Sequence, residues 1–300
     1  MQDFIQHLIN GISLGSIYAL IALGYTMVYG ILQLINFAHS DVYMMGAFVA
    51  YYSAKWLGIN ESPGISTLII LLIAAMVGCS VLGFSIERLA YRPLRKAPKL
   101  NILITAIGVS LFLEYSGQIL FGADPKVFPN VIQDSVIVDF AGIQLKSLDV
   151  AVLGVTVCVM LFLNFLIYRT KVGKAMRAVS TNMNVASLMG VNTDRIISFT
   201  FIVGSSLAGV GSVLVGMKYP KIEPLMGMMI GLKAFVAAVL GGIGSIGGAV
   251  LGGLIMGLSE EMVVGYFSST YRDALAFGIL IVILIFKPAG LLGKNSIEKV

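Results

Sequence analysis

Long apolar stretches separated by short polar segments recur along the whole chain, and they constrain its fold more than any other feature. A helix that crosses the hydrocarbon core of a bilayer needs about 20 mostly apolar residues. Nine such stretches cover residues 9–31, 41–59, 65–86, 100–121, 149–168, 196–217, 228–242, 246–262 and 271–287. The short ones near 228–262 leave a range of about 8–10 spans. The sequence therefore predicts an all-α fold, a polytopic transmembrane helical bundle formed by residues 1–300 as a single domain.

The amino-acid composition supports a membrane location. The chain is 58% hydrophobic and 12% charged, whereas soluble domains carry about a quarter charged residues. Cys79 and Cys158 both lie in apolar runs, which suits buried hydrophobic residues and argues against a disulfide framework or a metal site. With only two histidines in addition, we expect neither a metal nor a cofactor. No Lys or Arg precedes the first apolar run, so the first span is expected to be retained and not cleaved.

The distribution of Lys and Arg predicts the orientation. Three segments, residues 87–99, 169–195 and 287–299, hold most of the cations, and the loops between the other spans hold few. By the positive-inside rule these segments are cytoplasmic. Nine spans then place the N-terminus outside and make 122–148 the longest outer loop. Because the net charge of +5 is concentrated in short loops, we expect no nucleic-acid partner.

Glycine-rich segments predict close helix packing and one break. Small residues recur every fourth position at Gly11, Gly15 and Ala19, and again at Gly244, Gly248 and Gly252, a pattern typical of helices in close contact within a membrane. Five of the eight residues in 241–248 are glycine, which disfavours an uninterrupted helix. This stretch is either a tight cytoplasmic hairpin or a re-entrant element that lines a path. In the second case Gly242 and Gly244 are candidate path residues.

Polar residues within the apolar stretches are the next signal, because their burial in a membrane is costly. Glu114 is the clearest isolated case; it either faces a cavity or lies near the outer interface, hydrogen-bonded to a neighbouring helix. The segment 36–41 contains Asn36, His39 and Asp41; it either shapes a gate near a substrate or begins the next helix, with Asn36 or Ser40 as its cap. Lys233, one turn into its span, is expected to snorkel outward.

No set of residues indicates catalysis. The sequence lacks a phosphate-binding G-x-x-x-x-G-K-[ST] loop, an H-E-x-x-H pair and a G-x-S-x-G elbow. We therefore expect that the protein is not an enzyme, and that any active work draws on an ion gradient or on a partner chain.

The segment 169–195 is too short to span a membrane and too apolar for a solvated loop. Its apolar residues predict a short amphipathic helix ending at Gly190, suited to docking in a groove of a partner or to lying on the membrane surface. These apolar residues are Ala175, Ala178, Val179, Met183, Ala186, Leu188 and Met189.

The same segment resembles the cytoplasmic coupling loop of branched-chain amino-acid ABC transporter permeases. The matching residues are Gly173, Ala175, Arg177 and Ala178, followed by Asn184, Ala186, Leu188, Gly190, Val191 and Asn192. Residues 36–39, 231–245 and 287–293 resemble further motifs of this family, and the second half is most similar to the first permease subunit of the high-affinity leucine/isoleucine/valine system. Two positions depart from the family pattern: Ser40 stands where a glycine often follows the histidine, and Gly247 stands where a proline is common.

The resemblance implies a membrane-spanning subunit of an ATP-binding-cassette importer that carries leucine, isoleucine and valine across the inner membrane by alternating access. The implied partners are a second permease, expected to be a different chain, two cytoplasmic ATP-binding subunits and an extracytoplasmic substrate-binding protein. Residues 175–192 would dock on an ATPase, with this loop and the C-terminus in the cytoplasm. The alternatives are a permease for urea, amides or other amino acids, an ion-coupled secondary transporter, and a polytopic membrane enzyme.

Overall fold

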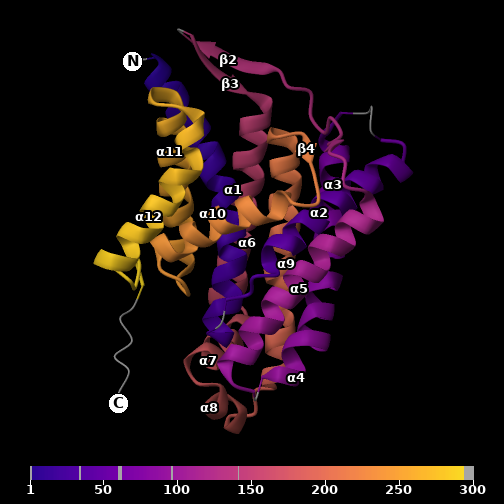
Figure 1. The fold of residues 1–300 in the computed structure, drawn as a ribbon, viewed down its shortest axis with the longest axis vertical. Coiled ribbons are helices and arrows are strands. Elements are labelled where there is room, and N and C mark those ends of the chain that lie inside the picture. Colours follow the sequence, from indigo (N-terminus) through magenta and orange to yellow (C-terminus); the bar gives the residue numbers. More distant parts are fainter. Residues whose placement is uncertain (1, 34, 60–62, 96, 141, 294–300) are drawn as a thin grey trace.

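The computed structural model describes residues 2–33, 35–59, 63–95, 97–140 and 142–293, which form a bundle of helices (Figure 1). Nine helices coincide with the nine predicted stretches. These are α1 (Gln2–Leu32), α2 (His39–Trp56), α3 (Ile65–Ile86), α5 (Lys99–Phe121), α6 (Ser147–Arg169), α9 (Thr193–Lys218), α10 (Met226–Gly241), α11 (Ile246–Tyr266) and α12 (Arg272–Phe286). The prediction of an all-α polytopic bundle is confirmed.

Within the described residues, seven helices are long and apolar enough to cross a membrane. This is two fewer than the nine stretches predicted, since α2 and α10 do not meet both requirements. Helix α12 qualifies because it continues the short helical turn before it, so that the span Ser269–Phe286 has 18 residues. Helix α10 has only 16 residues, fewer than the roughly 20 that a full crossing needs. Helix α2 has 18 residues and carries His39, Asp41 and Lys55. Both short helices lie against the interior of the bundle.

Short elements connect the spans. A π-helical turn, η1 (Glu87–Tyr91), continues α3 into α4 (Arg92–Leu94), and η2 (Ser269–Tyr271) precedes α12. Two antiparallel strand pairs form in the described chain: β1 (Lys126–Val127) with β4 (Lys221–Ile222), and β2 (Val136–Phe140) with β3 (Ile143–Lys146). Helices α7 (Lys171–Thr181) and α8 (Met183–Leu188) lie between α6 and α9.

The two ends of the bundle differ in the segments that they carry. The start of α1 and the β2–β3 hairpin lie at one end, and α4, α7 and α8 lie at the other (Figure 1). The Lys- and Arg-rich segments 87–99 and 169–195 therefore share one end, opposite the long loop 122–148. As the positive-inside rule predicts, these two cation-rich segments lie on the same side of the bundle.

Helix α1 forms the centre of the bundle and packs closely on α11. A side chain at Gly257 would collide with the backbone of Gly15, and one at Gly253 would meet Ala19 within 2.8 Å. Gly11 in turn faces Leu258. Close approach of helix backbones is how helices associate in lipid, where no hydrophobic effect draws them together. The ladder of Gly11, Gly15 and Ala19 is therefore a packing surface for α11.

The predicted glycine break is confirmed between α10 and α11. Gly242 and Gly244 adopt positive φ angles of 103° and 93°, which glycine tolerates without a steric penalty. Gly244 lies in this turn and so does not share a helix face with Gly248 and Gly252, contrary to the predicted ladder. The segment 287–293 covers the turn: the Leu291 amide donates to the Leu240 carbonyl at 2.8 Å, and the next amide donates to the Gly241 carbonyl at 2.9 Å.

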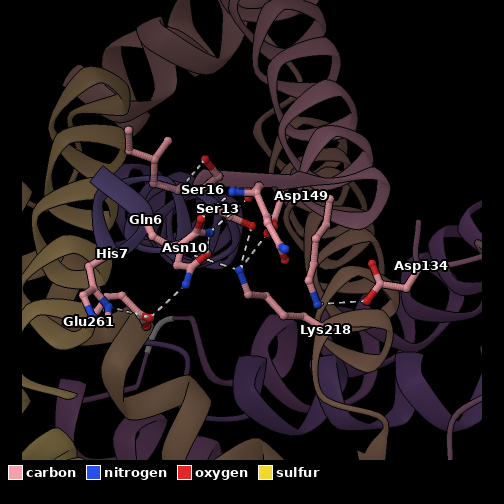
Figure 2. Close-up of polar contacts among 12 residues, drawn as sticks. Gln6, His7, Asn10, Ser13, Ser16, Asp134, Asp149, Lys218 and Glu261 are labelled. Carbon is pink, nitrogen blue, oxygen red and sulfur yellow. Dashed lines mark hydrogen bonds and ion pairs between the residues drawn. The ribbon is translucent and has the colours of Figure 1, made fainter. Parts of the chain in front are cut away.

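A polar network ties four helices together at the end that carries the β2–β3 hairpin (Figure 2). The Lys218 ammonium group at the end of α9 lies 3.1 Å from a carboxylate oxygen of Asp149 on α6 and donates to the Ser13 hydroxyl on α1 at 2.8 Å. Asn10 of α1 donates to Glu261 of α11 at 3.4 Å.

Candidate functional site

A cavity of about 270 Å³ lies among α1, α2, α5 and α10, next to the middle of α5. Its lining combines hydroxyl and carboxyl groups with aliphatic and aromatic side chains. The lining residues are Tyr25, Ile35, Phe37, Ser40, Asp41, Ile107, Ser110, Leu111, Glu114, Met228, Leu232 and Phe235. Two of the residues predicted for a translocation path, Asp41 and Glu114, thus meet in one cavity although they lie on different helices. We call this cavity the acidic pocket.

Asp41 is held by the first turn of α2, and its side chain is 3% exposed. The Ser110 hydroxyl donates a short hydrogen bond to its carboxylate. Glu114 lies one helical turn after Ser110 on α5, so both side chains share the face that lines the pocket. No Lys, Arg or His in the described ranges forms an ion pair with Asp41 or Glu114. Ionisable groups at this depth are expensive to bury and indicate function.

Asn36 and His39 lie behind the pocket, in the packed core. The Asn36 side-chain oxygen accepts a hydrogen bond from the Tyr91 hydroxyl at 2.7 Å. His39 is 1% exposed and packs edge-on against Tyr25, with ring centroids 4.6 Å apart. Neither residue lines the acidic pocket. Both hold α2 in place from its buried side.

The interpretation of Asn36 or Ser40 as a helix cap is wrong. Ala38 is the N-cap of α2, and no side chain caps that end. The Ser40 hydroxyl donates to the Phe37 carbonyl at 2.8 Å, within the first turn. Ser40 also lines the acidic pocket. The polar segment therefore contributes side chains to the pocket and does not cap the start of α2.

Gly242 and Gly244 do not lie at the acidic pocket. A side chain at Gly242 would collide with the backbone of Gly293. Gly244 lines a different cavity of about 540 Å³, shared with Thr26 of α1 and Arg177 of α7. The two glycines therefore belong to the end of the bundle that carries α7 and α8.

Lys233 does not snorkel outward, contrary to the prediction. Its side chain is 9% exposed, and its ammonium group lies 3.0 Å from Glu260 of α11 and 2.7 Å from Asp273 of α12. Glu260 also pairs with Arg272 at 2.9 Å and accepts from the Tyr18 hydroxyl at 2.8 Å. We call these five residues the buried ion cluster. Sequence reasoning missed Glu260, whose only signal was a carboxylate inside the apolar stretch 246–262.

The segment 169–195 forms two helices, where a single helix was predicted. The break falls at Asn182, whose side-chain oxygen accepts from the Val185 amide at 3.0 Å and so caps α8. In the same way, the Thr170 hydroxyl accepts from the Gly173 amide at 3.0 Å and caps α7. The spacing of the apolar residues therefore does not reveal the break at Asn182, because the amphipathic pattern continues from α7 into α8.

The predicted coupling residues divide into buried and exposed sets. Gly173 and Ala186 are buried and Ala175 is half-buried, whereas Arg177, Ala178, Asn184, Leu188, Gly190 and Asn192 are exposed. Gly190 has a φ of 82°, and the Asn192 side chain caps α9 by accepting from the Arg195 amide at 3.1 Å. The apolar side chains that project from this end are Leu188 and Met189, 85% and 80% exposed, and Val185, 53% exposed. We call these three the α8 tip.

An ionic cluster fixes the helix that follows the α8 tip. Asp194, in the first turn of α9, pairs with Arg92 and Arg95 at 2.6 Å each. Arg95 also pairs with Glu87 of the π-helical turn, and Glu87 accepts from the Ser198 hydroxyl at 2.6 Å. The fully buried Glu87 was not singled out from sequence, since it reads as part of a charged loop.

Comparison with known proteins identifies the family. The family model for the branched-chain amino acid transport system permease component matches residues 7–284. The high-affinity branched-chain amino acid transport system permease protein BraD of Pseudomonas aeruginosa is 42% identical, covering 99% of this chain and 98% of the relative. The corresponding permease protein LivH of Escherichia coli is 43% identical, with the same two coverages.

A more distant relative is the probable branched-chain amino acid transport permease protein LivH of Methanocaldococcus jannaschii. It is 31% identical over 93% of this chain and 90% of its own length. The match to the family model extends over the acidic pocket, the buried ion cluster and the α8 tip. The chain belongs to the branched-chain amino acid transport permease family.

Proposed function

We propose that this protein is the permease subunit of an ATP-binding-cassette importer, and that it carries leucine, isoleucine and valine across the inner membrane. The observation that carries the proposal is the α8 tip: an exposed apolar surface beside the ion-paired start of α9, in a chain whose sequence has no phosphate-binding loop. Such a chain draws its energy from an ion gradient or from a partner, and an exposed docking surface favours the partner. Three relatives that match more than nine-tenths of the chain are named as branched-chain amino acid transport permeases, and these names support the substrate class.

The α8 tip is the proposed docking surface for a cytoplasmic ATP-binding subunit. Leu188 and Met189 expose most of their apolar surface, which suits insertion into a groove. Ala186 beneath them is buried, so it supports α8 and does not contact the partner. In this orientation the end with α7 and α8 faces the cytoplasm, as the positive-inside rule requires.

The acidic pocket is the proposed part of the translocation path within this chain. Ile107, Leu111 and Met228 at its rim are 44%, 46% and 59% exposed, so the pocket opens at the side of the bundle. Lipid there would leave carboxylates facing hydrocarbon, which is unfavourable. A second permease covering this opening removes that cost, so the path lies between two permeases. Asn36 and His39 support the pocket from behind.

Alternating access needs an element with two packings that a partner can bias. The turn with Gly242 and Gly244 is suited to this role, because it joins the short helix α10 to α11 and lines a cavity next to α7. An extracytoplasmic binding protein would deliver substrate at the opposite end, where the β2–β3 hairpin lies.

The test is uptake of radiolabelled leucine by cells or proteoliposomes containing the full transporter, with the double substitution Leu188→Asp and Met189→Asp. We expect this variant to remain in the membrane, to lose co-purification of the ATP-binding subunits and to lose uptake. The matched control Leu188→Met keeps the surface apolar and should retain both. Unchanged uptake by the charged variant would contradict the proposal, and uptake driven by an ion gradient without ATPases would favour a secondary transporter.

A further inference from the structure

We propose that the acidic pocket binds the amino acid in transit, with Asp41 and Glu114 receiving its α-ammonium group and the apolar wall receiving its side chain. This inference rests on the proposed function and adds to it the residues that recognise the cargo. It also predicts which class of cargo the path accepts, namely a small cationic or zwitterionic amine with an aliphatic side chain.

The first argument is charge. Asp41 and Glu114 line the same pocket, and within the described parts of the chain neither has a cationic partner. Glu260, another buried carboxylate of the bundle, does have cationic partners, because it pairs with Lys233 and Arg272. Two uncompensated carboxylates favour a ligand that brings its own positive charge and several N–H donors. An α-ammonium group meets both requirements, whereas urea and simple amides carry no charge.

The second argument is shape. The pocket volume of about 270 Å³ lies just below the range of about 300–1,000 Å³ that accommodates drug-sized ligands, and so suits a single small molecule. The lining combines the two carboxylates and the hydroxyls of Ser40 and Ser110 with aliphatic and aromatic side chains, among them Leu111, Leu232 and Phe235. A ligand with one charged end and one branched aliphatic end matches this mixed lining.

The third argument concerns the carboxylate of the cargo. Helix α10 begins at Met226, and its third residue, Met228, lines the pocket. Gly227 and Gly231 pack so closely on Ser40 that an added side chain would collide with it, which fixes this helix end beside the turn that carries Asp41. The N-terminus of a short helix carries partial positive charge, and in transporters such helix ends point at anionic substrate groups. We therefore place the carboxylate of the cargo at the start of α10.

Ser110 is a positioning residue in this arrangement. Its hydroxyl donates to the Asp41 carboxylate and leaves the remaining lone pairs of that carboxylate for the ligand. Removing the hydroxyl should weaken binding less than removing the charge, because the carboxylate itself remains.

The experiment uses the complete transporter, with its ATP-binding subunits and binding protein, in lipid nanodiscs. Photo-leucine, a leucine analogue with a diazirine in its side chain, is supplied through the binding protein, and cross-linked peptides are identified by mass spectrometry. We expect cross-links within 99–121 of α5 and 226–241 of α10. Asp41→Asn and Glu114→Gln should each reduce cross-linking and leucine uptake at least tenfold. Ser85→Ala removes an exposed hydroxyl of α3 that donates only to the Val81 carbonyl of its own helix, and it is the control, with no change expected.

The outcomes separate this inference from the proposed function. If the wild-type transporter takes up leucine and both Asp41→Asn and Glu114→Gln cross-link and transport normally, the inference is overturned and the permease function remains. If the wild-type assembly takes up no branched-chain amino acid, the proposed function itself fails. Should Asp41→Asn not assemble, Glu114→Gln decides alone, because Glu114 is only partly buried and makes no hydrogen bond in the described structure. Cross-links confined to other helices overturn the inference as well.

Discussion

The buried ion cluster allows a quantitative test of how α10 is held in the bundle. Glu260 is 1% exposed and is the common partner of Lys233, Arg272 and Tyr18. The substitution Glu260→Gln keeps the shape of the side chain and removes its charge. Lys233 then retains Asp273 at 2.7 Å, whereas Arg272 loses the carboxylate with which it pairs.

The expected cost follows from these contacts. Removing one member of a buried ion pair costs about 3–5 kcal/mol, because the other charge remains buried. The Arg272 side chain is 30% exposed and is therefore partly solvated, so we expect a loss near the lower limit, about 3 kcal/mol. Lys233→Met leaves Glu260 bonded to Arg272 and Tyr18, so it should cost less, about 1.5–3 kcal/mol for lost hydrogen bonds to a charged group.

The assay is reversible unfolding in mixed micelles by titration with sodium dodecyl sulfate, followed by far-ultraviolet circular dichroism. The matched control is Asp134→Asn, which breaks the Lys146 pair at 3.2 Å in which both side chains are about half exposed. An exposed pair contributes at most about 1 kcal/mol. The double variant of Lys233 and Glu260 should cost less than the sum of its two single changes, since the two residues are in contact.

Two results would refute this reasoning. A loss for Glu260→Gln no larger than that for Asp134→Asn would mean that the cluster contributes no more than a surface pair. Strict additivity of Lys233→Met and Glu260→Gln would mean that the two side chains do not interact.

Two further predictions concern glycines. Gly257→Val should prevent stable assembly of the bundle and lower the monodisperse yield in detergent, because a side chain there collides with the Gly15 backbone. The control Gly154→Val should leave this yield unchanged, because a side chain at that position meets nothing within 4 Å. Equal yields for the two variants would contradict the packing role of α1. Gly242→Ala should release the segment 287–293 from the α10–α11 turn, because the residue combines a φ of 103° with backbone contact to Gly293. Limited proteolysis near Lys287 should then be faster than in the wild-type protein. A wild-type digestion rate would show that the turn tolerates a side chain.

Helix positions followed well from the sequence, because apolar length and Lys/Arg distribution are local properties. All nine predicted stretches are helical, and the glycine-rich break falls where residues 241–248 predicted it. The capped turn at Asn182 was missed because an amphipathic pattern can continue on both sides of a short break. Asparagine is itself a preferred N-cap, so that signal was present in the sequence.

Side-chain partners could not be derived in the same way. Lys233 was expected to reach the interface because snorkelling is the usual outcome for an isolated lysine. Its actual partners, Glu260 and Asp273, lie on two other helices, and no sequence spacing connects them. Asp41 and Glu114 were each singled out from their apolar surroundings, but their meeting in one pocket depends on how α2 and α5 pack.

Helix α9 is fixed by ion pairs at both of its ends. Asp194 joins its first turn to Arg92 and Arg95, and Lys218 joins its last turn to Asp149 and Ser13. A helix clamped in this way cannot absorb a displacement by fraying at either terminus. We therefore expect α9 to move as a rigid helix. A displacement of α8 on one side of the membrane should then produce a displacement of similar size in α1 and α6 on the other side.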